Sequence, residues 1–201
     1  MKKAVVLFIC AIIIFSTCSC GAGSKQLPES FIKFEIEDYI ALEDIENYYT
    51  YETQHSYDSD TNLDTVDITL TVQHDYADEI ITGKCVYYYD KASDIWERAR
   101  TTKWSEPIIN FVDNKLEKKY SGEFPYNTGT YEITIHDINF ESSTVNCSYN
   151  AICSLSWGRS LVVEGKDTFE LQKGNFFVIP GNNGCLEIIL TKDGVWIIPT
   201  D

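Results

Sequence analysis

The feature that most constrains the fold of this chain is a series of short runs in which apolar and polar residues alternate. Residues 65–75 ("TVDITLTVQHD") alternate cleanly, which is the pattern of a strand with one buried face. Three further runs either alternate in the same way or are rich in Tyr and Thr, residues that suit a pleated sheet. They predict neighbouring strands at residues 47–57, 80–90 and 94–101. We therefore expect a four-stranded antiparallel meander in the first half of the chain.

Residues 29–43 ("ESFIKFEIEDYIALE") fit two patterns. Ile32 and Ile36 begin a helical spacing, and Ser30 is placed to cap the start. Ile32, Phe34 and Ile36 also alternate with charged residues, as a strand would. We favour the helix, which makes residues 29–105 an α+β unit.

The second half of the chain shows only strand signals. Credible turns ("SWGRS", "QKGN", "PGNNG" and "KDG") separate short apolar or alternating runs. The predicted strands are residues 131–139, 144–155, 161–171, 176–179, 186–191 and 195–199. Regular short strands of this kind predict an all-β module over residues 106–201, an up-and-down antiparallel sheet or small barrel.

The N-terminus has the pattern of an export signal. Lys2 and Lys3 precede an unbroken apolar run at residues 4–15. That length fits the roughly 7–15 residue core of a signal peptide and falls short of the ~20 residues of a membrane-spanning helix. We expect the mature chain to be extracytoplasmic.

Small residues around two cysteines indicate the kind of export. The stretch "FSTCSCGAGSKQ" resembles the lipobox of bacterial lipoproteins, in which a peptidase cuts before a cysteine that carries a diacylglycerol. The resemblance implies a signal peptide at residues 1–19 and lipidation of Cys20, because Ser19 precedes it and Gly21 follows it. Cys18 is the less favoured attachment site. Both cysteines lack the aliphatic residue that the lipobox pattern prefers three positions earlier. Plain secretion after a cut near residues 22–24 is the alternative.

Two acyl chains hold a protein stably on a membrane, so residues 20–28 are expected to form a lipidated, flexible tether. The expected location is the outer face of the cell membrane. A CxC metal site at Cys18 and Cys20 is the competing interpretation, but no histidine or second cysteine pair lies near them.

The charge of the chain restricts its partners. The formal net charge is −15, and loss of Lys2 and Lys3 would make it more negative. An acidic surface repels a nucleic-acid backbone and anionic lipid. We therefore expect no nucleic-acid partner, and we expect membrane attachment to come from the anchor.

The order of motifs along the chain resembles a group of uncharacterised small lipoproteins of Gram-positive bacteria. The resemblance rests on "LDTVDITLTV…GKCVYYYD…IWERA" and then "YSGEF…GTYEITIHDI…STVNCSYNAIC…KDGVWI". It implies an N-terminal cystatin- or NTF2-like α+β module followed by a lipocalin-like β module. It transfers no activity and no site residue.

One stretch imitates a calcium-binding loop. "DSDTNLD" offers oxygens at Asp58, Asp60, Asn62 and Asp64, alternate positions as in an EF-hand. The sixth position is Leu63 instead of glycine, and the twelfth is not glutamate. A polar hairpin loop, in which Asp and Asn bond their own backbone, is the favoured interpretation, so no metal is expected.

Catalytic motifs are weak. His55, His74 and His136 lack zinc-site spacing, and there is no G-x-S-x-G nucleophile motif. A pair of carboxylates suited to glycan hydrolysis cannot be picked from 31 acidic residues. We expect no enzyme and no cofactor, with an envelope enzyme acting on glycan through acidic residues as the alternative.

The remaining cysteines could form a disulfide outside the cell. Cys147 and Cys153 are six residues apart, about 20 Å in one extended strand, which is too far for a bond between them. A bond from Cys185 to Cys147 or to Cys153 is the prediction, and Cys85 is expected to be a buried thiol. The expected function is binding of a surface protein, a glycan or a small apolar ligand.

Overall fold

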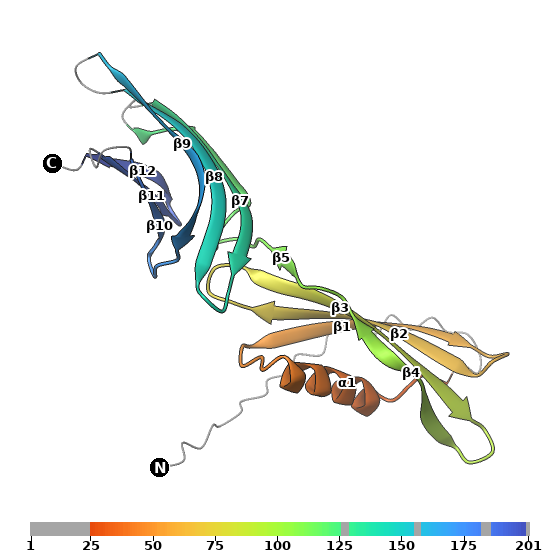
Figure 1. Ribbon diagram of the computed structural model, residues 1–201. Coiled ribbons are helices and arrows are strands. Elements are labelled where there is room, and N and C mark those ends of the chain that lie inside the picture. Colours follow the sequence, from red (N-terminus) through yellow and green to blue (C-terminus); the bar gives the residue numbers. More distant parts are fainter. Residues whose placement is uncertain (1–24, 126–128, 155–157, 182–185, 200–201) are drawn as a thin grey trace, which may run out of the picture. The chain divides into compact units, whose positions relative to one another are not determined.

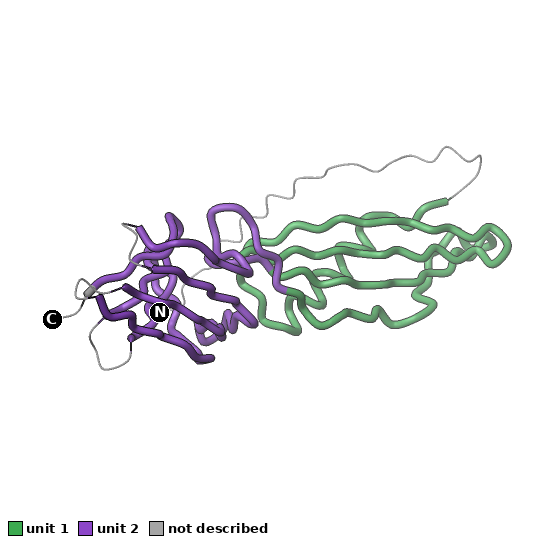
Figure 2. The backbone as a smooth tube through the Cα atoms, turned by 90° about the horizontal axis from the view of Figure 1, so that it is seen from above, with its two compact units in different colours: residues 1–73, 79–108 green, residues 74–78, 109–201 purple. Residues whose placement is uncertain are grey.

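The computed structural model of the chain describes residues 25–125, 129–154, 158–181 and 186–199 (Figure 1). Within these ranges it is mostly antiparallel strand, with one short helix. The chain divides into two compact units, coloured separately in Figure 2. The first takes the chain up to Gln73 together with Glu79–Ile108, and the second takes His74–Asp78 together with everything from Ile109 onward.

The first unit is a helix followed by an antiparallel meander, so the strand order β1-β2-β3-β4 follows the chain. A short fifth strand, β5 (Ile108–Asn110), pairs with β3. The other elements are α1 (Glu29–Leu42), β1 (Tyr49–Asp58), β2 (Leu63–Gln73), β3 (Asp78–Asp90) and β4 (Ile95–Trp104).

Helix α1 confirms the helical interpretation of the ambiguous segment, and its start corrects the expected cap. Pro28 occupies the N-cap position, no side chain caps the helix, and Ser30 lies inside the first turn. Proline is tolerated here because the first N–H groups of a helix have no partner within the helix, so its missing N–H removes no hydrogen bond. The backbone N–H of Phe31 donates to the carbonyl of Pro28.

The apolar alternation of β2 forms the centre of the first core. Val66, Ile68, Leu70 and Val72 are at most 1% exposed. They pack in one cluster with Ile32 and others from α1, so the helix covers one face of the sheet. The apolar residues whose spacing predicted α1 and β2 are therefore the residues that α1 and β2 bury.

A buried carboxylate fixes the helix to the sheet. Glu35 of α1 is 3% exposed and accepts hydrogen bonds from Tyr87 of β3 and from Thr102 of β4, the latter at 2.7 Å. Arg98 of β4 forms an ion pair with it at 2.6 Å. Burial and the bond to Glu35 raise the pKa of Tyr87 to about 12. Both oxygens of Glu35 thus have partners, as a buried charge requires.

The second unit consists of two antiparallel sheets that share one core. One sheet has the order β6-β7-β8-β9 and the other the order β10-β11-β12. Figure 1 shows the smaller sheet on the concave side of the larger one, and buried residues of both form a single cluster. The strands are β6 (Lys119–Glu123), β7 (Gly129–Asn139), β8 (Thr144–Ser154), β9 (Ser160–Glu170), β10 (Asn175–Pro180), β11 (Leu186–Thr191) and β12 (Gly194–Pro199).

Of the two forms expected for the second half, an antiparallel sheet or a small barrel, the structure shows open antiparallel sheets and no closed barrel among the described residues. The chain leaves the larger sheet after β9 and begins a separate sheet at β10. Phe176 and Phe177 are consecutive and both buried, and the pairing of β10 is irregular between Asn175 and Phe177. A bulge of this kind bends a strand. β10 pairs with β11 in the smaller sheet and does not extend the larger one.

The unit boundary also differs from the one expected at residue 105. Residues 74–77 connect β2 to β3 of the first sheet and Asp78 begins β3, yet residues 74–78 belong to the second unit. Ala77 is fully buried in the second core, and the carbonyl of Tyr76 accepts from the N–H of Leu116 at 2.9 Å. Lys115 pairs with Asp78 at 2.5 Å. These long-range contacts leave no mark in the local sequence pattern.

Candidate functional site

The residues predicted for lipidation and for the disulfide fall mostly outside the described residues. Cys18 and Cys20 precede residue 25, and Cys185 lies in the gap between residues 181 and 186. Cys85, Cys147 and Cys153 are described, and all three are buried free thiols. Cys147 and Cys153 lie on the same face of β8, as their even spacing requires.

The three described thiols are chemically protected. Burial raises the pKa of Cys85 to about 11, that of Cys147 to about 12, and also that of Cys153. At pH 8 a thiol with a pKa of 11 or 12, as for Cys85 and Cys147, is ionised in roughly one molecule in a thousand or fewer. Because the thiolate is the reactive form, these side chains are unsuited to nucleophilic catalysis.

We expect all three thiols to resist alkylation at pH 8 in the folded protein and to react fully in denaturant. Peptide mass mapping after iodoacetamide treatment measures this residue by residue, with the unfolded chain as the reference. Equal labelling rates at Cys85 in the folded and unfolded chain would contradict the assignment of this thiol to the core.

The last residues of the expected tether are fixed on the first unit. Leu27 is 3% exposed within the core, and its N–H donates to Asp64 at 2.8 Å. Lys25 pairs with Asp94 and lies over the ring of Tyr89, 3.9 Å from the centroid. The described part of the expected tether, residues 25–28, therefore packs on the first unit through the buried side chain of Leu27.

The residues of the calcium-like stretch do not point to one place. Asp58 accepts from the N–H of Asp60 and the hydroxyl of Thr61, at 2.9 and 2.7 Å, within the β1–β2 hairpin. Asn62 adopts a left-handed φ of 57° at the turn. Asp64 instead is fully buried on β2. In the described ranges, no group of three or more His, Cys, Asp or Glu side chains could hold a metal ion.

Each histidine has a separate local partner. His55 Nδ1 lies 2.9 Å from Asp64, His74 stacks on Phe140 with 3.9 Å between the rings, and His136 lies 3.0 Å from the hydroxyl of Ser148. One oxygen of Asp64, Oδ1, has no hydrogen-bond partner among the described residues. Among the described residues, the three histidines therefore have three different partners.

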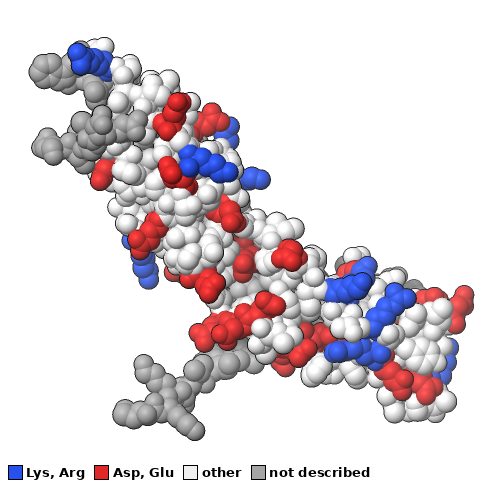
Figure 3. All heavy atoms as spheres, viewed as in Figure 1, with Lys and Arg blue, Asp and Glu red and all other residues white. Residues whose placement is uncertain are grey.

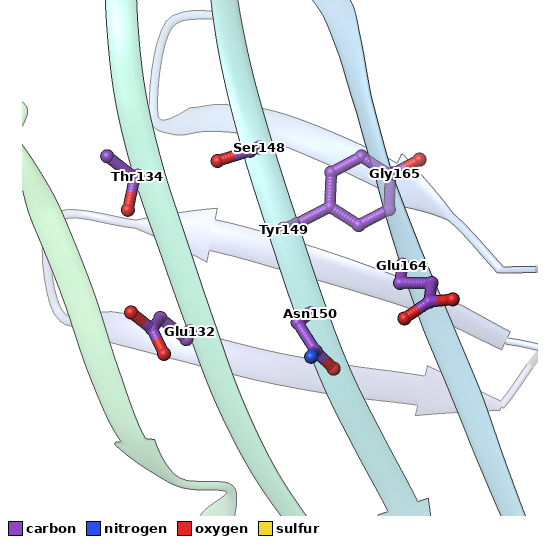
Figure 4. A pocket seen from close by; sticks show the side chains of 7 residues that line it. All are labelled: Glu132, Thr134, Ser148, Tyr149, Asn150, Glu164 and Gly165. Carbon is purple, nitrogen blue, oxygen red and sulfur yellow. The ribbon is translucent and has the colours of Figure 1, made fainter.

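One candidate binding surface is a hollow of about 540 Å³ on the four-stranded sheet of the second unit. Glu132 of β7 lies opposite Asn150 of β8, and Asn150 lies opposite Glu164 of β9. Figure 4 shows these three side chains in one row across the strands, with Thr134 and Ser148 in the next row. Because they alternate with buried residues such as Ile133 and Ala151, they belong to the outer face of the sheet.

Thr134 and Ser148 lie on one side of the row of Glu132, Asn150 and Glu164, and two apolar residues lie on its other side. Ile152 of β8 and Val162 of β9 are paired in register and are 45% and 46% exposed. They are two residues from Asn150 and Glu164, so they share the outer face. The outer face thus carries an exposed apolar pair next to the hollow, outside the residues that line it.

The two carboxylates differ in their surroundings. Glu132 forms an ion pair with Lys119 of β6 at 2.6 Å, whereas Glu164 makes no ion pair within the described part of the chain. Beneath the row, Tyr149 extends toward Gly165 (Figure 4), where a Cβ atom would come within 2.6 Å of its hydroxyl. That hydroxyl donates to Asp167 at 2.9 Å. Burial and this bond raise the pKa of Tyr149 to about 12.

No known protein family, curated protein or solved structure matches this chain. In the described part, no helix has the length and apolar character needed to cross a membrane.

Proposed function

We propose that this protein is a lipid-anchored binding protein at the outer face of the cell membrane, without catalytic activity. The location follows from the signal-like residues 1–19 and from Cys20. The observation that supports binding is the hollow on the outer face of β7, β8 and β9, where Glu132, Asn150 and Glu164 stand in register.

The ligand class that fits this hollow best is a glycan. Carboxylate and amide groups accept and donate hydrogen bonds to hydroxyls, and the hydroxyls of Thr134 and Ser148 extend this set. The exposed pair of Ile152 and Val162 gives the apolar faces of sugar rings a surface to contact. Specific pockets combine apolar area with a few placed polar groups, which is the arrangement on this face.

Binding fits the site better than hydrolysis, the alternative proposal. Glu132 and Glu164 are separated by two strand spacings, about 10 Å, which is at the wide end of the distance for glycan-hydrolysing carboxylate pairs. The ion pair with Lys119 also engages Glu132. A general acid needs a raised pKa, which an apolar and enclosed setting provides, and this face is open to solvent.

A small apolar ligand inside the second unit is less well supported. The space between its two sheets is filled by side chains, among them Phe124, Phe177 and Leu186, each at most 2% exposed. The resemblance to a cystatin- or NTF2-like module followed by a lipocalin-like module stays a proposal for the first unit. For the second unit, the only feature in common with a lipocalin-like module is the antiparallel pairing of strands, because the sheets are open.

The glycan proposal is tested with the full chain, in neutral detergent, against an array of cell-surface oligosaccharides. Binding is expected, and Glu164→Ala or Asn150→Ala should weaken it at least tenfold, because each removes hydrogen-bonding groups from the row. Glu170→Ala is the matched control, since Glu170 is exposed on the same strand outside the hollow. That variant should bind within twofold of the original chain.

Two results would contradict the proposal. One is unchanged glycan affinity in both hollow variants, and the other is the absence of binding to every oligosaccharide. Release of shortened products from a bound oligosaccharide, lost in Glu164→Ala, would favour the enzyme instead.

A further inference from the structure

The outer face of the first sheet carries a second hollow, of about 410 Å³, with a different chemistry. Lys84 of β3 and Lys103 of β4 line it and lie directly opposite each other in the antiparallel register. Figure 3 shows basic side chains gathered on one part of this unit, although the chain as a whole is strongly acidic.

The two lysines are only partly compensated by acidic groups. Asp67 of β2 pairs with Lys84 at 2.9 Å, and Lys103 makes no ion pair in the ranges that the structure describes. Arg100 adds to the excess, because it lies opposite Val86, the next residue of β3 on this face. Like charges placed directly opposite each other destabilise a sheet, so an anion held between Lys84 and Lys103 would relieve a repulsion.

Neutral donors complete the hollow. Thr69 of β2 and Thr82 of β3 line it with their hydroxyls, which can donate to an anionic oxygen. On the buried face Trp104 packs against Gly83, where a Cβ atom would lie 2.5 Å from the indole ring. Because Gly83 lies next to Lys84 and Trp104 next to Lys103, this contact fixes the backbone that carries both lysines.

We propose that this hollow binds a phosphate dianion, as inorganic phosphate or as a phosphate monoester. Such a group carries close to two negative charges at neutral pH and presents several acceptor oxygens. It matches two ammonium groups flanked by two hydroxyls. The proposal concerns the first unit and does not depend on the glycan site of the second.

The acidity of the chain selects a compact anion over a polymer. At physiological salt, interactions between exposed charges are largely screened beyond about 8 Å. A single phosphate in the hollow therefore senses mainly the nearby charges of Lys84, Lys103, Arg100 and Asp67. A long polyanion would also meet the acidic surface around them, which repels it.

The test is a titration of the full chain, isotope-labelled and in neutral detergent, with inorganic phosphate at constant ionic strength set by chloride. Backbone amide shifts are expected to be confined to Thr69, Thr82, Lys84, Lys103 and their neighbours. The variant Lys84→Gln/Lys103→Gln should weaken phosphate binding at least tenfold. Lys119→Gln/Lys166→Gln removes the same charge from the second unit and should stay within twofold.

The melting temperature, measured with and without phosphate, is a second readout. It can be recorded even for a variant that no longer binds phosphate. Without phosphate, Lys103→Gln should leave the melting temperature unchanged or raise it, because it removes the repulsion. In saturating phosphate, the same variant should melt below the original chain. Equal responses to phosphate and chloride, or unchanged binding in the Lys84→Gln/Lys103→Gln variant, would overturn the proposal.

The source of the phosphate is distinguished by two further probes. Glycerol phosphate in solution should displace inorganic phosphate if the ligand is a soluble monoester. Flotation with phosphatidylcholine vesicles that contain phosphatidic acid, compared with phosphatidylcholine alone, tests a lipid headgroup. A response to either probe that the Lys84→Gln/Lys103→Gln variant loses supports the phosphate site, and a response that this variant keeps counts against it.

Discussion

Replacement of Glu35 by alanine is expected to destabilise the first unit by about 3–5 kcal/mol, as is typical when one partner of a buried charged network is removed. Glu35 is 3% exposed and engages Tyr87, Arg98 and Thr102. The alanine variant leaves these three groups without their acceptor beneath α1. Urea unfolding monitored by circular dichroism measures the change in the free energy of unfolding.

Two variants separate the network from other effects of the substitution. Glu37→Ala makes the same change at an exposed position of the same helix and should alter stability by less than about 0.5 kcal/mol. Glu35→Gln keeps the shape but removes the charge, and should fall between the two. A loss below about 1 kcal/mol in Glu35→Ala would contradict the role assigned to this carboxylate.

Phe177→Ala is expected to destabilise the second unit by a similar amount, about 3–5 kcal/mol, because it removes a large buried ring and leaves a cavity. Phe177 of β10 is fully buried and stacks on Phe169 of β9, with 5.7 Å between the ring centroids. This contact joins the two sheets. Hydrogen exchange of the amides of β8 and β11 in urea measures the loss.

The control for this substitution is Trp196→Ala. Trp196 lies on β12 of the same sheet and is 41% exposed, so its removal leaves little cavity. A change below about 1 kcal/mol is expected, since substitutions on the surface are usually small. If Trp196→Ala cost as much as Phe177→Ala, the assignment of the inner and outer faces of this sheet would be wrong.

The local fold could be predicted from the sequence wherever a pattern reports one buried face. The alternation of Val66, Ile68, Leu70 and Val72 identified β2, and the same reasoning located most of the other strands. Strand β6 (Lys119–Glu123) escaped because its residues are mostly exposed and carry no alternation. The separation into two sheets lies in the pairing of the strands, which no local pattern specifies.

The candidate sites were beyond the reach of sequence patterns for a geometric reason. Glu132, Asn150 and Glu164 meet only because three strands pair in a particular register, and the same holds for Lys84 and Lys103. One signal was available and was missed. Asp64 is two residues before Val66 and four before Ile68, so it shares their face of the strand and its position predicts burial. The polar stretch around it suggested a loop instead.

The measurement that tests the central proposal most directly is the intact mass of the mature protein, extracted with detergent from a Gram-positive host. We predict a chain that begins at Cys20 and carries a diacylglycerol, recovered with the membrane. A chain that begins after Cys20, carries no lipid and is recovered from the medium would contradict the anchor. The protein would then be a freely secreted binding protein.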